Sequence, residues 1–103
     1  MPPIITVVGL GPGHPSARTI AAQRALDGAQ RILLRTSIHP GLEDLAEDPR
    51  VSNCDDLYEQ LQTFDQVYTS IVERILDLAT TAPVVYAVPG HPFFGERTVD
   101  LLR

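Results

Sequence analysis

The stretch IITVVGLGPGHP, residues 4–15, decides the fold of this 103-residue chain. Residues 4–9 form a continuous, mainly β-branched run, which is the pattern of a strand covered on both faces in a parallel sheet. Residues 9–15 hold three glycines and two prolines, and a helical pattern follows them. We therefore expect a strand near the centre of a parallel sheet, with a stiff loop at its carboxyl end.

The rest of the chain alternates helical and strand patterns. Ser16 is a plausible N-cap of a helix that ends near Gly28, and Thr63 with Gln66 forms a capping-box pattern before the clearest helix. The stripe of that helix, expected to be core, is Phe64, Val67, Tyr68, Ile71, Val72, Ile75 and Leu76. The other expected elements are strands at 31–35, 51–53 and 83–88, a short acidic helix at 42–47, a loop at 89–95 and a helix from 96 to 103.

Strands that alternate with crossover helices predict an α/β fold with a parallel sheet. Ligands of such sheets bind beyond the carboxyl ends of the strands. Gly-His-Pro occurs twice, at residues 13–15 and 90–92, and follows a predicted strand both times. We therefore expect both turns to lie on one edge of the sheet and to build one ligand site.

Composition excludes several classes of protein. The net charge of −5 leaves no basic stripe for nucleic acid or for a membrane surface, and no apolar run approaches the length of a spanning helix. We expect no direct nucleic-acid partner and no membrane. A single cysteine, Cys54, suits a reducing compartment, so the cytoplasm is the expected location.

The glycine-rich loop is a poor match to nucleotide-binding fingerprints. Gly-x-Gly-x-x-Gly requires its third glycine at position 14, where this chain has His14, and no Walker lysine is present. A plain tight turn with glycines at positive φ is the alternative for the loop alone. Arg35 and Thr36 occupy the place where a ribose-binding acid is usually sought, which leaves NADP as a weaker alternative.

Neither metal binding nor nucleophilic catalysis is favoured. His14, His39 and His91 each precede a proline, and no pair has the spacing of helical metal ligands. We interpret the acidic residues as solvated faces of helices rather than as a magnesium site; they are Glu43, Asp44, Glu47, Asp48, Glu73 and Asp77. Two aspartates follow Cys54 and would raise its pKa, so it is a poor nucleophile.

Two motifs resemble those of the tetrapyrrole (corrin/porphyrin) methylase family. TVVGLGPGHP, residues 6–15, looks like the opening of that family, and VPGHPFFG, residues 88–95, is similar to its second S-adenosylmethionine motif, usually Gly-Asp-Pro. The motifs lie about 80 residues apart in the family's order. LRTSIHPGLEDL, FDQVYTSIVERILDLA and His91 in place of aspartate resemble the methylase-like N-terminal domain of MazG-type (YabN-like) proteins.

The resemblance implies a three-layer sandwich, with residues 1–103 forming the N-terminal lobe of a methylase domain that continues beyond them. It implies S-adenosylmethionine as cofactor and an S-adenosylmethionine-dependent methyltransferase as the activity. The implied cofactor-binding residues are Gly11, Pro12, Gly13, Pro89, Gly90, His91 and Phe94. The alternative is a regulatory module fused to a nucleoside triphosphate pyrophosphohydrolase. A lobe that lacks its partner would expose an apolar face, so we also expect a homodimer.

Overall fold

A four-stranded parallel sheet forms the centre of the computed structural model, which describes residues 4–11, 18–37, 42–45 and 47–88. The strands are β1 (Ile5–Gly9), β2 (Arg31–Leu34), β3 (Val51–Asn53) and β4 (Val84–Val88). Their order in the sheet is β1-β4-β2-β3, and every pairing is parallel. The predicted parallel α/β fold is therefore confirmed. The loop predicted at 89–95 and the helix predicted at 96–103 lie outside the described residues.

β4, rather than β1, is the most buried strand. All five residues of β4 are buried, as a strand hydrogen-bonded on both edges and covered on both faces requires. Among the described strands β1 lies at one end of the sheet, and the Ile4 side chain beside it is 51% exposed. The prediction that residues 4–9 lie near the sheet centre was therefore wrong for the described part of the chain. An apolar run in the sequence indicates that a strand is buried, but it does not indicate the position of that strand in the sheet.

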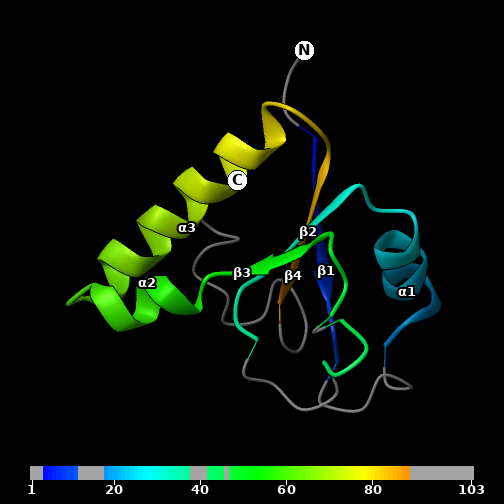
Figure 1. Ribbon diagram of the computed structural model, residues 1–103, viewed down its shortest axis with the longest axis horizontal. Helices are drawn as coiled ribbons and strands as arrows, with labels where there is room; N and C mark the ends of the chain where they lie inside the picture. Colours follow the sequence, from blue (N-terminus) through cyan, green and yellow to red (C-terminus); the bar gives the residue numbers. More distant parts are fainter. Residues whose placement is uncertain (1–3, 12–17, 38–41, 46, 89–103) are drawn as a thin grey trace.

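Helices cover the two faces of the sheet and complete three layers (Figure 1). Helix α1 (Ile20–Asp27) packs on one face, while α2 (Asp55–Gln60) and α3 (Phe64–Ala79) lie on the other. The α1-side core contains Val8, Leu10, Ala22, Leu26, Ile32, Leu34, Leu42, Leu45, Val85 and Ala87. The α3-side core contains Leu33, Cys54, Val67, Ile71, Ile75, Ala79, Val84, Tyr86 and Val88. Alternate residues of β4 thus point into different cores, as the two-residue period of a strand dictates.

Helix α1 begins three residues later than the sequence pattern predicted. Thr19 is the N-cap, with extended backbone and a side-chain oxygen that accepts a hydrogen bond from the Ala22 N–H. Ser16, the predicted N-cap, lies outside the described residues and is not the residue that caps α1. Ser and Thr are both favoured at the N-cap, so residue type alone could not distinguish Ser16 from Thr19. The predicted end of the helix near Gly28 is confirmed.

Helix α3 begins as predicted, with the reciprocal capping box between Thr63 and Gln66. Its fully buried residues are Val67, Ile71, Ile75 and Ala79. Phe64 is 70% exposed and Leu76 is 42% exposed, so placing these two side chains in the core was wrong. Phe64 instead stacks on Tyr68, with ring centroids 6.2 Å apart. The stripe that faces the sheet is therefore narrower than the run of apolar residues.

The acidic helix predicted at 42–47 is absent from the described residues of that segment. The N–H groups of Leu45 and Asp48 each donate to a carbonyl three residues earlier, which gives two successive turns. Helix α2, in contrast, was not predicted. Its signals were the acidic pair Asp55-Asp56, which suits the first turn of a helix, and Asn53, whose side-chain oxygen accepts from the Asp55 N–H.

Replacing Ile71 by alanine should lower the free energy of unfolding by about 2–5 kcal/mol, because a completely buried side chain leaves a cavity. Leu76→Ala removes a similar volume from the partly exposed side of the same helix. It should cost under about 1 kcal/mol. Urea unfolding of both variants measures the difference. Equal losses would contradict the assignment of the buried face.

Candidate functional site

The loops that follow β1 and β4 begin side by side. Gly9 is paired with Val88 in the register of the two strands, and the Leu10 N–H donates to the Val88 carbonyl over 2.8 Å. Both strands end there, at the carboxyl edge where parallel sheets bind ligands. The structure thus confirms that the two motif-bearing stretches leave neighbouring strands at the same edge.

Of the seven residues predicted to bind the cofactor, only Gly11 lies within the described part of the chain. Gly11 has φ of 78°, and no non-glycine residue among those described has a positive φ. A side chain at this φ would cost about 1–2 kcal/mol. Gly11 thus adopts, just beyond β1, a conformation that favours glycine. Pro12, Gly13, Pro89, Gly90, His91 and Phe94 lie outside the described residues, as do His14 and His39.

The end of β2 contributes a polar network to the same edge. The Arg35 guanidinium donates to the Tyr58 hydroxyl over 3.0 Å. Asp55 accepts hydrogen bonds from the Thr36 hydroxyl over 2.6 Å and from the backbone N–H and hydroxyl of Ser37. Partial burial opposes ionisation of Asp55, but the bonds from Ser37 and Thr36 outweigh it and lower its pKa. This network fixes the first residues after β2 against helix α2.

An ion pair joins the segments that follow β1 and β2. Both guanidinium nitrogens Nη1 and Nη2 of Arg18 donate to the two carboxylate oxygens of Asp44, at 2.8 and 2.9 Å. The Arg18 side chain is 1% exposed, and it is the one charged residue that is buried among those described. Sequence reasoning missed this pair, because a separation of 26 residues carries no periodic signal.

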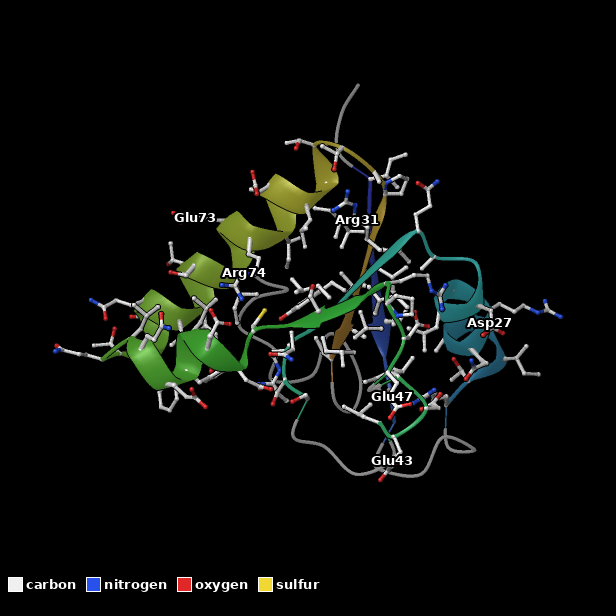
Figure 2. All side chains as sticks on the ribbon, viewed as in Figure 1. Asp27, Arg31, Glu43, Glu47, Glu73 and Arg74 are labelled. Atoms are coloured by element: carbon white, nitrogen blue, oxygen red, sulfur yellow. The ribbon has the colours of Figure 1, made fainter. Side chains whose placement is uncertain are left out.

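The groups considered for other chemistries are engaged in structural contacts or lie apart. Burial raises the pKa of the Cys54 thiol to about 11, and Asp56 and Asp55 add less to that rise than burial does. Glu43 and Glu47 lie on the segment after β2, while Glu73 lies on α3, well away from them (Figure 2). Among the described residues no three His, Cys, Asp or Glu side chains are placed to hold a metal ion. None of the described helices is long and apolar enough to cross a bilayer.

Two surface hollows lie at the amino edge of the sheet, opposite the motif-bearing loops. One of about 500 Å³ is lined by Arg31, Arg50 and Val51, among others, and one of about 330 Å³ by Thr6 and Pro83, among others. Arg50 is committed to Asp48 and to carbonyls at the end of α1. Both hollows lie at the end of the strands opposite to the edge at which parallel sheets bind ligands, so the carboxyl edge is the better candidate.

The fold defines a parallel α/β domain, and the carboxyl edge of its sheet is the candidate ligand site. The family described as Tetrapyrrole (Corrin/Porphyrin) Methylases matches residues 5–103. The chain therefore belongs to the tetrapyrrole methylase family, a family that uses S-adenosylmethionine as methyl donor, and it forms a methylase-like domain.

Two relatives show how the chain compares with longer proteins. It is 42% identical over 99 residues to "Uncharacterized protein YabN" of Bacillus subtilis (strain 168), a match that covers 95% of this chain and 20% of that protein. It is 27% identical to the solved uroporphyrin-III-C-methyltransferase of Thermus thermophilus, with a TM-score of 0.68 over 97% of this chain and 40% of that one. The chain thus spans less than half of either relative.

Replacing Asp44 by asparagine should destabilise the fold, because the buried Arg18 guanidinium loses its counter-charge. Asp44 is itself 44% exposed, so we expect a loss of about 1 kcal/mol, at the lower end of the range for an unsatisfied buried donor. Glu43→Gln removes the same charge from an exposed neighbour and should change stability by under about 0.5 kcal/mol. Urea unfolding at neutral pH measures both.

The same pair predicts the pH dependence of that difference. Hydrogen bonds from Arg18 hold the pKa of Asp44 below its usual 3.8, although burial opposes them. A lowered pKa in the folded state stabilises the protein above pH 3.8, and this stabilisation is lost as the pH falls through the folded-state pKa. The stabilities of wild type and Asp44→Asn should therefore converge as the pH falls below about 4. A constant difference from pH 7 to pH 3 would contradict the ion pair.

Proposed function

We propose that this chain is the cofactor-binding first lobe of an S-adenosylmethionine-dependent methyltransferase domain. The observation that carries the proposal is the hydrogen bond from Leu10 to Val88, because it starts the two motif-bearing loops from neighbouring points. Gly11, Pro12 and Gly13 bind the cofactor from the first loop. Pro89, Gly90, His91 and Phe94 bind it from the second.

The chemistry of methyl transfer suits this edge. The cofactor supplies a methyl group on a cationic sulfur, and its in-line displacement requires positioning more than acid or base groups. A cationic donor requires no phosphate cradle, which agrees with loops that contain two prolines each, since proline has no backbone N–H to offer a phosphate. The positive φ of Gly11 lets the chain turn at the strand end, where backbone can approach a ligand closely. The described part of the site therefore fits the cofactor.

Binding of S-adenosylhomocysteine, the product form of the cofactor, tests this function. Calorimetric titration of the protein at its native length should give heat with one site per chain. Gly11→Ala should weaken binding by about tenfold. An alanine costs about 1–2 kcal/mol at this φ, and that cost is expected to oppose the binding conformation. No heat at millimolar ligand would overturn the function.

Gly28→Ala is the matched control for that measurement. Gly28 ends α1 with φ of −89°, and an added Cβ would make only an ordinary contact, 3.5 Å from the Arg24 carbonyl oxygen. The same change of residue type away from the carboxyl edge should leave the affinity unchanged. An equal loss in both variants would show that the effect of Gly11→Ala is a general one.

A regulatory module attached to a nucleoside triphosphate pyrophosphohydrolase is the second candidate. The observation in its favour is the length of the relatives: the match covers 20% of YabN but 40% of the methyltransferase, so YabN has room for a domain beyond a methylase. Release of pyrophosphate from nucleoside triphosphates by the native-length protein, with magnesium, tests this candidate. Cofactor binding without transfer to any acceptor would favour it, and methyl transfer without pyrophosphate release would exclude it.

A further inference from the structure

The Arg18–Asp44 ion pair fixes the residue at which the connection from β1 to α1 ends. Arg18 follows the stretch 12–17 and directly precedes Thr19, the N-cap of α1. Asp44 lies in the segment that follows β2 and the stretch 38–41. The pair therefore joins the end of the β1–α1 connection to the middle of the β2–β3 connection, and both connections leave the carboxyl edge of the sheet.

Asp44 is held in place by the core on both sides of it. Leu42 is 5% exposed and Leu45 is 4% exposed, and both belong to the same core cluster as Leu10, the residue that hydrogen-bonds to β4. Arg18 donates two hydrogen bonds to this carboxylate and a third to the Gln23 side chain over 3.3 Å. A two-pronged contact of this kind sets both the distance and the angle between its partners.

Stability alone is a weak reason for such a pair. Removing an arginine side chain from water carries a large desolvation cost, and well-packed apolar residues in place of a buried pair often stabilise a fold as well or better. Apolar side chains in place of the pair would not fix the relative orientation of the two segments that it joins. The buried Arg18–Asp44 pair is thus better suited to fixing the relative position of two segments than to strengthening the core.

We propose that Arg18 and Asp44 are positioning residues for cofactor binding, because their ion pair fixes the point at which the loop that follows β1 enters α1. This inference rests on the proposed function, because it needs a ligand at that loop. Neither side chain is assigned a contact with the cofactor. If loss of the pair leaves the competent arrangement populated for only about a tenth of the time, the dissociation constant rises about tenfold.

The chain contains a matched control pair. Arg74 makes the same two-pronged contact with Asp56, at 2.8 and 2.8 Å, and its side chain is 33% exposed. Figure 2 shows Arg74 on α3, on the face of the sheet opposite α1. Asp56→Asn therefore removes an ion pair of equal geometry without touching the connection between β1 and α1.

The test is calorimetric titration of the native-length protein with S-adenosylhomocysteine, paired with urea unfolding midpoints. Asp44→Asn should raise the dissociation constant about tenfold, whereas Asp56→Asn should leave it within about twofold of wild type. The double variant Arg18→Met/Asp44→Leu should regain a wild-type unfolding midpoint, because it removes both buried charges together. Its dissociation constant should nevertheless stay raised, a result that a merely structural pair would not give.

The outcomes separate the two proposals. A wild-type dissociation constant in the double variant would overturn the positioning role while leaving the cofactor site intact. Absence of binding by the wild-type protein would overturn the proposed function and this inference together. If Asp44→Asn does not fold, the double variant and Arg18→Lys decide the matter. Arg18→Lys keeps the charge but loses the two-pronged geometry, and it should also weaken binding.

Discussion

The pairing of β4 between β1 and β2 is the constraint on which the rest of the structure depends. It places Gly9 beside Val88 and Leu34 beside Ala87, so that three strands end at nearly the same level. A shift of one residue would turn Tyr86 and its alternating neighbours toward the wrong core, which makes the register costly to change. Apolar packing along the strands thus brings together the ends of β1 and β4, from which the two family motifs continue.

Ion pairs hold loops and helix ends that lie outside the sheet. Three arginines each hold an aspartate: Arg18 holds Asp44, Arg50 holds Asp48, and Arg74 holds Asp56. Hydrogen bonds from Arg50 lower the pKa of Asp48 to about 2, and Arg50 also donates to three carbonyls near the end of α1. Arg74 reaches the Asn53 carbonyl at the end of β3. In a chain of net charge −5, these contacts fix loops and helix ends rather than fill the core.

Local sequence patterns predicted much of the fold. The parts that they missed depend on contacts between residues far apart in the sequence. The strands and the start of α3 follow from apolar runs and from the Thr63–Gln66 capping box, all readable within a few residues. The helix expected at 42–47 failed because that segment is held from outside, by the burial of Leu42 and Leu45 and by Arg18. For the site, the sequence located both motif-bearing strand ends. It could not reveal the Arg18–Asp44 pair, since nothing local marks a contact 26 residues apart.

Three polar or reactive groups of the described chain are bound into its structure. Cys54 is buried with a raised pKa, Asp55 is engaged by Thr36 and Ser37, and Arg35 is held by Tyr58. Methyl transfer needs a donor and an acceptor held in line, and rigid loops can provide that. The same rigidity would serve a module that only senses the cofactor, so the two candidate functions share one binding geometry and differ in whether an acceptor can reach the methyl group.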